Sequence, residues 1–300
     1  MRMWSLNAAT EMQLELQTLS LWYNKATRRL IMSVLKLKDA DIYYGVHGNG
    51  PPFLFLSETA CDGEVWKIYQ VPEFSRDHTV VTFDYRGMGQ SSKPSMKYTM
   101  EMFADDAAAI LDYLKLDQAI VCGHSMGGRV AQVLALKHPS KVKKLILASS
   151  GAGYPEQRGI PLKLCVEMVE MGYEKYAREH TITVGWTEDY LGKHWDKVEK
   201  FLQVRWQNMP PLECFLRHII ARHECNTRAR LKDIRVPTLV LVGAEDHISA
   251  SNLSHRTSSE ELAKGIPNAK LALLPGECHH FFSTEPAAAH KIIRDFLRES

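Results

Sequence analysis

Short runs of apolar residues alternate with stretches of helical periodicity along most of the chain. Continuous apolar runs of this length are typical of strands that are buried on both faces of a sheet. Residues 34–37 and 42–47 alternate like a hairpin with a turn at 39–41. We expect further strands at 53–56, 79–83, 119–122, 142–148, 238–242 and 269–274, and helices at 66–74, 99–114, 126–138 and 287–297. Strands that alternate with helices predict an α/β protein with a mostly parallel central sheet and helices on both faces.

This alternation stops between residues 155 and 229, where no buried strand is expected. The stretch has helical spacing and is rich in tyrosine, tryptophan and phenylalanine. An insert that leaves a parallel sheet at the carboxyl end of a strand lies over the usual ligand crevice. We therefore predict an α/β core at 32–154 and 230–300 with a helical cap at 155–229.

The segment 1–31 precedes the predicted core and is not needed by it. Glu11 and Glu15 interrupt the apolar stretch that a signal peptide requires. No segment of the chain reaches the roughly 18 apolar residues of a membrane-spanning helix, so we expect no stable membrane insertion. Three hypotheses stay open for 1–31: a helical extension packed on the core, a stretch upstream of a natural start at Met32, or a basic amphipathic helix that touches a membrane surface or a partner.

The 300-residue chain is nearly neutral, with 37 lysines and arginines against 35 aspartates and glutamates and a formal charge of +2. This balance argues against a protein that binds nucleic acid through bulk charge. The six cysteines are scattered and form no C-x-x-C pair, which is typical of reduced thiols in a cytoplasmic protein. A small molecule is therefore the expected partner, and homodimer formation is left open.

The sequence Gly-His-Ser-Met-Gly at residues 123–127 follows a predicted strand and begins a predicted helix. So tight a turn forces Ser125 into strained backbone angles, and the small Gly123 and Gly127 avoid collisions across it. The amide of Met126 and the helix dipole then point toward a developing oxyanion. An ordinary helix N-cap serine is the alternative, but it requires neither glycine. We expect Ser125 to be a nucleophile.

With this motif the chain resembles the α/β-hydrolase family, from about residue 34 to residue 297. The resemblance rests on segments in a fixed order: 53–56, 83–91 (FDYRGMGQS), 123–128 (GHSMGG), 242–246 (VGAED) and 275–279 (PGECH). It implies an α/β-hydrolase fold with an inserted cap and a triad in the chain order serine, acid, histidine. The serine at the turn also excludes the aspartate-nucleophile branches of this family.

The resemblance assigns the general base to one of two neighbouring histidines, His279 and His280. Both follow the strand expected at 269–274 and a Pro-Gly turn. The Pro-Gly-x-x-His spacing favours His279, whereas the spacing back from Glu285-Pro286 favours His280. We prefer His279 and keep His280 as its rival.

Asp246 is the expected acid, because it follows the strand at 238–242 by a short turn and matches the family's position for this residue. Glu245 is the adjacent rival. The pair His279 and His280 could also suggest a metal, but no matching Asp, Glu or His spacing accompanies it. We therefore expect neither a metal nor a cofactor.

The loop after the strand at 53–56 departs from the family pattern. Where the family usually has His-Gly, this chain has Ser57-Glu58, followed by Thr59. The resemblance assigns the oxyanion hole to the backbone N–H groups of Thr59 and Met126. A carboxylate at Glu58 would oppose negative charge in the transition state. Glu58 therefore either points away and pairs with a nearby cation, which we favour, or alters the chemistry.

These residues predict a serine hydrolase that cleaves a small carboxylic ester or lactone through an acyl-enzyme. One alternative keeps the triad but cleaves a C–C bond or an enol-lactone of aromatic catabolism. Such substrates carry carboxylates and need a cation in the pocket, whereas we expect the candidates Arg129, Arg217 and Arg222 to be surface charges. Another alternative is a ligand-sensing protein of the same family with little turnover.

Overall fold

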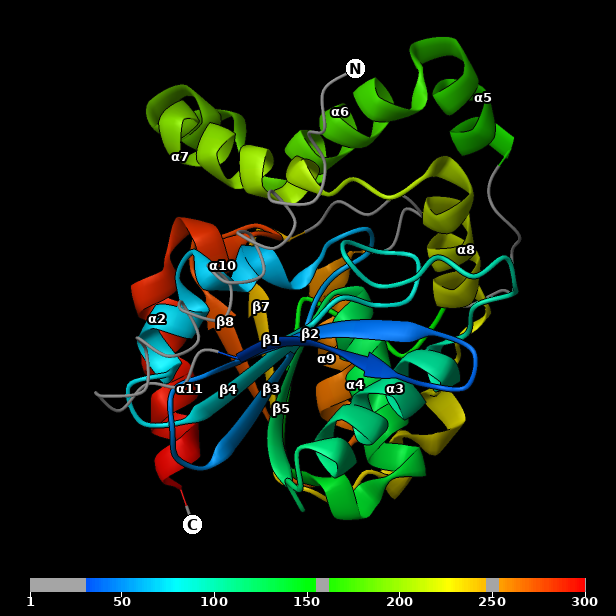
Figure 1. The fold of residues 1–300 in the computed structure, drawn as a ribbon. Coiled ribbons are helices and arrows are strands. Elements are labelled where there is room, and N and C mark those ends of the chain that lie inside the picture. Colours follow the sequence, from blue (N-terminus) through cyan, green and yellow to red (C-terminus); the bar gives the residue numbers. More distant parts are fainter. Residues whose placement is uncertain (1–30, 155–161, 247–253, 300) are drawn as a thin grey trace, which may run out of the picture.

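The computed structural model describes residues 31–154, 162–246 and 254–299. The hypotheses for residues 1–30 and for the beginning of the predicted cap, 155–161, lie outside the described residues. The described residues form one eight-stranded sheet with helices on both of its faces (Figure 1). The predicted α/β architecture with a mostly parallel sheet is therefore confirmed.

Every strand of the sheet coincides with an apolar run of the sequence. The strands are β1 Ile31–Lys36, β2 Asp41–His47, β3 Pro52–Leu56, β4 Thr79–Phe83, β5 Ala119–His124, β6 Val142–Ala148, β7 Thr238–Gly243 and β8 Ala269–Leu274. Their order in the sheet is β1-β2-β4-β3-β5-β6-β7-β8. β2 pairs antiparallel with both β1 and β4, and the remaining pairs are parallel.

The central strands of the sheet determine where a ligand-binding site can form. All six residues of β5 are buried, and this strand lies between β3 and β6. The carboxyl ends of parallel strands meet at one edge of a sheet, where ligands bind in open α/β folds. The residue after β5 is Ser125, which therefore lies in the middle of this edge.

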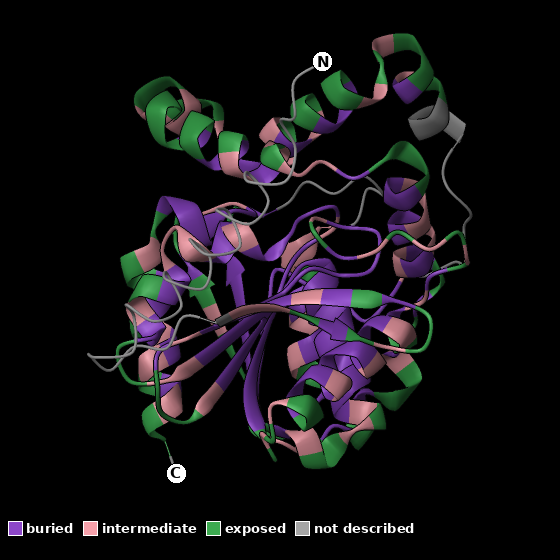
Figure 2. Cartoon of the chain, in the orientation of Figure 1, coloured by how far each residue is buried: buried purple, intermediate pink, exposed green. Residues whose placement is uncertain are grey.

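Two layers of helices cover the sheet (Figure 1). Helices α3 (Met100–Tyr113), α4 (Met126–Lys137) and α9 (His255–Gly265) lie on one face, and α2 (Gln70–Phe74) and α11 (Pro286–Arg298) lie on the other. Buried apolar side chains accordingly form two clusters, one on each face. Figure 2 shows that burial is concentrated in the strands and in the sides of the helices that face them. Burial on both faces explains why central strands such as β5 have continuous apolar sequences.

Two of the sequence expectations differ from the structure in detail. β1 begins at Ile31, before the expected residue 34, because Ile31 still pairs with Val46 of β2. The helix expected at 66–74 is two elements, the 3₁₀ helix η1 (Gly63–Lys67) and α2. η1 starts separately because the Asp62 carboxylate accepts a hydrogen bond from the Glu64 N–H and caps it.

Four α-helices of the described residues lie between β6 and β7, and we call them the inserted helices: α5 (Leu162–Met171), α6 (Tyr173–Gly185), α7 (Glu188–Gln207) and α8 (Leu212–Glu224). In Figure 1, α6 and α7 lie over the carboxyl edge of the sheet. The division of the chain into a core and a cap domain stays a prediction. No helix in the described part of the chain is long and apolar enough to cross a bilayer.

Candidate active site

Ser125 lies at the sharp turn between β5 and α4. Its φ is 54° and its ψ is −113°, and backbone angles of this kind cost a residue with a side chain about 1–3 kcal/mol. The segment at the end of β6 holds the turn in place. The Ser125 N–H donates to the Ala148 carbonyl at 2.9 Å, and the Ser150 hydroxyl donates to the Ser125 carbonyl at 2.8 Å.

There is no room for a side chain at Gly123 or Gly127, the two glycines of the motif. A Cβ at Gly123 would lie 2.2 Å from the Gly127 carbonyl oxygen. A Cβ at Gly127 would lie 2.1 Å from the Leu56 carbonyl oxygen, at the end of β3. Both distances are far below a van der Waals contact, so the turn that presents Ser125 requires glycine at both positions.

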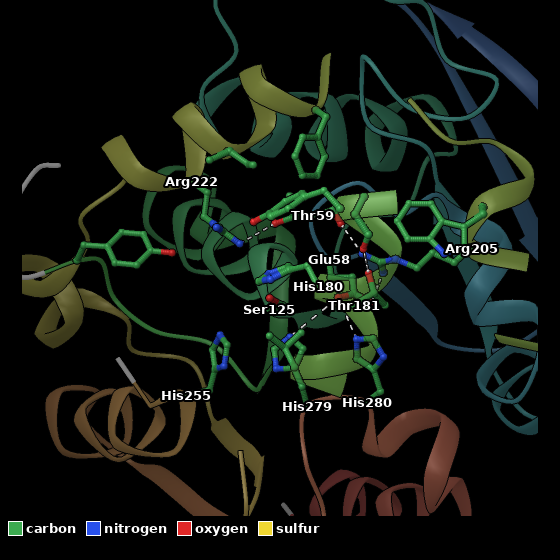
Figure 3. Close-up of a pocket in the computed structure, with 17 residues that line it drawn as sticks. Glu58, Thr59, Ser125, His180, Thr181, Arg205, Arg222, His255, His279 and His280 are labelled. Carbon is green, nitrogen blue, oxygen red and sulfur yellow. Dashed lines mark hydrogen bonds and ion pairs between the residues drawn. The ribbon is translucent and has the colours of Figure 1, made fainter. Parts of the chain in front are cut away.

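Ser125 and His279 line the same cavity, which has a volume of about 70 Å³ (Figure 3). The loop after β3, the turn after β5, the loop after β8 and the inserted helices all contribute to its wall. The ionisable side chains in the wall, other than tyrosines, are Glu58, His180, Arg205, Arg222, His255, His279 and His280.

The structure brings His279, and not its rival His280, to Asp246. His279 Nδ1 lies 3.0 Å from Asp246 Oδ2, and both side chains are buried. The other carboxylate oxygen, Asp246 Oδ1, lies 3.0 Å from Nδ1 of His255. The rings of His255 and His279 have their centroids 4.3 Å apart. Asp246 thus accepts hydrogen bonds from two histidines, and Nε2 is the nitrogen of His279 that can serve a nucleophile.

Burial and charge fix the protonation of this pair. Burial by itself would raise the pKa of Asp246, but His279 and His255 outweigh it and hold that pKa well below its usual value. Burial lowers the pKa of His279, and the Asp246 carboxylate opposes this only in part. At neutral pH the carboxylate is therefore ionised and the imidazole is neutral, which are the states that a general base and its orienting acid need.

His280 forms a second buried pair, with Glu58. Glu58 Oε2 lies 3.4 Å from His280 Nε2 and 4.0 Å from His279 Nε2. Glu58 Oε1 accepts a hydrogen bond from Nη1 of Arg205, on α7, at 2.5 Å. The expectation that Glu58 pairs with a nearby cation is therefore right. The expectation that it points away is wrong, because its carboxylate lies beside both histidines in the cavity wall (Figure 3).

The pairing keeps Glu58 ionised without leaving its charge uncompensated. Burial would raise the pKa of Glu58, but Arg205 and His280 outweigh it and hold that pKa well below its usual value. Arg205 is itself almost fully buried. Because the ion pair is neutral overall, its field at a nearby oxyanion is weaker than that of a lone carboxylate.

Thr59 is held by two arginines of the inserted helices. Its carbonyl accepts a hydrogen bond from Arg205 Nη2 at 3.0 Å, and its hydroxyl accepts one from Arg222 Nη1 at 3.2 Å. Met126 is the first residue of α4, so its N–H has no acceptor within that helix. Thr59 shares the cavity with Ser125, and Met126 follows Ser125 directly. Their role as oxyanion donors stays a prediction.

Two overlapping groups of side chains in the described part of the chain have the composition of a metal site. One is Glu58 with His279 and His280, and the other is Asp246 with His255 and His279; within each group the ligand atoms lie within 4.8 Å of one another. Arg205 already neutralises Glu58 in the first group. In the second group the Nδ1 atoms that a metal would need already form the hydrogen bonds to Asp246. The geometry therefore favours proton-based chemistry at both groups.

Several residues of the site escape the sequence prediction. His255 begins α9 and Arg205 lies on α7, and neither belongs to a motif that could have identified it. The expectation that Arg129 and Arg222 are surface charges is wrong. Arg129 is buried, with its guanidinium over the ring of Tyr154, and Arg222 lines the cavity.

Comparison with known proteins identifies the family. The family model described as the alpha/beta hydrolase fold matches residues 47–286. The chain therefore belongs to the alpha/beta hydrolase fold family, as the nucleophile turn and the order of its motifs predict. Several of its relatives and structural neighbours are named as hydrolases of different kinds, which supports a hydrolytic activity.

Two relatives and one solved structure illustrate this range. The chain is 28% identical over 266 residues to a protein of Azorhizobium caulinodans that is named, provisionally, carbamate hydrolase RutD; the match covers 87% of this chain and 96% of the relative. It is 28% identical over 219 residues to 3-oxoadipate enol-lactonase 2 of Acinetobacter baylyi, covering 72% and 79% of the two chains. A thermophilic esterase from Thermogutta terrifontis superposes with a TM-score of 0.76 at 26% identity, covering 91% and 98%.

Proposed function

We propose that this protein is a serine hydrolase that cleaves a small carboxylic ester or lactone. One observation carries the proposal: Ser125, at its strained turn, lines the same cavity as His279, and His279 Nδ1 is hydrogen-bonded to the buried carboxylate of Asp246. A serine hydroxyl is a weak nucleophile at neutral pH and needs a neutral base within reach. The lowered pKa of His279 supplies that base.

The reaction follows from these positions. Ser125 Oγ attacks the carbonyl carbon of the substrate while His279 Nε2 accepts the hydroxyl proton, and Asp246 stabilises the imidazolium that forms. The N–H groups of Thr59 and Met126 donate to the oxyanion. The imidazolium then protonates the leaving alcohol, and His279 activates the water that hydrolyses the acyl-enzyme.

The cavity favours a substrate with few atoms on either side of the carbonyl, because its volume of about 70 Å³ is far below that of sites for drug-sized ligands. The names of the relatives are compatible with this chemistry, since a carbamate and an enol-lactone each carry a carbonyl carbon open to the same attack. An enol-lactone is the second candidate substrate, supported by the name of the Acinetobacter relative and by the cation Arg222 in the cavity wall.

Ser125→Ala tests the nucleophile. Wild-type protein is expected to react with a fluorophosphonate probe and to hydrolyse p-nitrophenyl acetate and butyrate, with acetate preferred by the small cavity. Ser125→Ala should lose both labelling and turnover, whereas Ser95→Ala, which changes an exposed serine, should retain both. Turnover that survives in Ser125→Ala would mean that the nucleophile is misassigned. Labelling of Ser125 without turnover of any ester in a panel would favour the ligand-sensing alternative.

A further inference from the structure

One cation in the cavity wall has no carboxylate partner among the described residues. Arg222, on α8, lines the cavity and is partly buried. It forms no ion pair with any residue in the described ranges, and its hydrogen-bond partner there is the neutral hydroxyl of Thr59. The other formal charges of the wall, Glu58 and Arg205, neutralise each other. The cavity therefore carries an excess positive charge on the α8 side.

Two other arginines show how a carboxylate can balance such a charge. Arg86 pairs with Asp106 in the core, and Arg294 pairs with Glu73 at the surface of α11. Arg222 is partly removed from water with no ion-pair partner among the described residues. Such a position is costly for a cation, and a bound anion would supply the missing charge. The positive charge also affects its surroundings, since burial together with Arg222 and Arg205 lowers the pKa of His180 to about 4.

The hydrogen bonds of Arg222 leave one edge of its guanidinium available. Nη1 donates to the Thr59 hydroxyl at 3.2 Å, whereas Nε is buried and has no acceptor among the described residues. The Nε–H and a neighbouring Nη2–H of a guanidinium point in parallel, which matches the two oxygens of a carboxylate. In Figure 3 Arg222 lies across the cavity from Arg205, with Thr59 between them.

We propose that Arg222 forms an anion subsite and that the preferred substrate is an ester or lactone that carries a carboxylate. The assignment of the substrate class rests on the proposed function, while the subsite itself rests on a guanidinium that forms no ion pair with any described residue. The carboxylate binds the free edge of Arg222 by two hydrogen bonds while the reacting carbonyl lies at Ser125. Because Arg222 also holds Thr59, one side chain positions the anionic end of the substrate relative to the loop that borders the carbonyl.

A pair of esters of similar size tests the substrate class. Monomethyl succinate carries a carboxylate at pH 7.5, and methyl butyrate is neutral. We expect wild-type kcat/KM, followed by acid release, to favour the anionic ester at least tenfold. Arg222→Gln should lower the ratio of the two kcat/KM values by tenfold or more, chiefly through KM for the anionic ester, and Arg222→Lys should restore part of it. The ratio cancels any common effect that acts through Thr59.

A binding measurement separates the subsite from the proposed function. In a Ser125→Ala background, calorimetry should detect succinate binding, and adding Arg222→Gln should weaken it at least tenfold. Arg217→Gln is the matched control, because Arg217 lies on the same helix and donates to exposed Ser95 instead of lining the cavity; it should change neither readout. Succinate binding without ester turnover would support the subsite and contradict the proposed function. The subsite proposal would be overturned if Arg222→Gln lowered kcat/KM equally for both esters, or if no succinate binding were detected.

Discussion

The Asp246 carboxylate accepts hydrogen bonds from two histidines, and this arrangement determines which groups of the candidate site are charged. Each carboxylate oxygen accepts one Nδ1–H at 3.0 Å, from His279 and from His255. A second histidine on the acid holds the carboxylate in place and keeps it ionised. The same neighbour lowers the pKa of His279, because two positive imidazoles with centroids 4.3 Å apart repel each other.

The pH profile of hydrolysis should report this arrangement. A protonated His279 cannot accept the serine proton, so kcat/KM should fall as pH falls through the pKa of His279. That pKa is lowered, chiefly by burial, which puts the acidic limb below the usual histidine value of about 6.5. His255→Gln removes one repelling charge and should move the limb to higher pH, as measured with p-nitrophenyl acetate from pH 4.5 to 8. The control His290→Gln, on α11, should leave the acidic limb of the pH profile where it is in the wild type. If His255→Gln also left it unmoved, the electrostatic coupling between His255 and His279 would be refuted.

The ion pair of Glu58 and Arg205 is a second residue-scale feature with a measurable effect. Breaking a buried pair leaves one charge without a partner, which costs about 3–5 kcal/mol. Glu58→Gln should therefore lower the free energy of unfolding in urea by that order, and Glu58→Gln combined with Arg205→Leu should recover most of the loss. Lys291→Gln breaks the exposed pair with Asp295 and should cost less than about 1 kcal/mol. A loss that small in Glu58→Gln would contradict the buried pair.

Among the elements, the turn between β5 and α4 has the least freedom. It passes so close to the end of β3 that a methyl group at Gly127 would overlap the Leu56 carbonyl. β3, β5 and β6 together fix the height at which Ser125 stands above the sheet. The position of the proposed nucleophile thus depends on three strands and not on the serine alone.

Gly127→Ala should consequently disturb the whole turn. With the Cβ 2.1 Å from backbone, neither side can yield cheaply, and we expect a loss of several kcal/mol of folding free energy together with loss of fluorophosphonate labelling. Gly192 offers a matched control, because it lies within α7 and a Cβ there meets nothing within 4 Å. Gly192→Ala should be neutral or stabilise by up to about 1 kcal/mol. A Gly127→Ala protein with wild-type stability would show that the turn adapts.

The elements themselves could be predicted well because their sequence signals are local. Strands buried on both faces need continuous apolar runs, and the nucleophile turn needs glycine at fixed spacing. The helix expected at 66–74 illustrates the limit. Its apolar spacing does not reveal that the Asp62 carboxylate caps a separate short helix that begins at Gly63 and ends at Lys67.

At the scale of the whole molecule, the site is made of segments far apart in the sequence. The wall of the cavity combines Glu58, Ser125, Arg205 and His279 from separate loops and helices. A sequence shows that His279 and His280 are neighbours, but only the path of the loops decides that one turns to Asp246 and the other to Glu58. The motif residues were therefore predictable, and the pairings with Arg205 and His255 were not.

Buried histidines should make the fold sensitive to acid. Burial lowers the pKa of His124 to about 3 and of His218 to about 4, against about 6.5 in an unfolded chain. Between those values the unfolded state binds more protons, so the free energy of unfolding should fall as pH drops from 6.5 toward 4. Urea unfolding at pH 7 and 4.5 measures the loss, and His218→Gln should narrow the difference. Equal stability at both pH values would contradict this expectation.

The two arginine contacts to Thr59 have a mechanical consequence. Arg205 comes from α7 and Arg222 from α8, and both reach down to the same residue after β3. Any shift of these helices that widened the cavity for a bulky ester would also withdraw both guanidinium groups from Thr59. If Thr59 donates to the oxyanion as proposed, making room for an oversized substrate would displace the residue that stabilises its transition state. Such a substrate would then be excluded by a loss of reactivity as well as by its size.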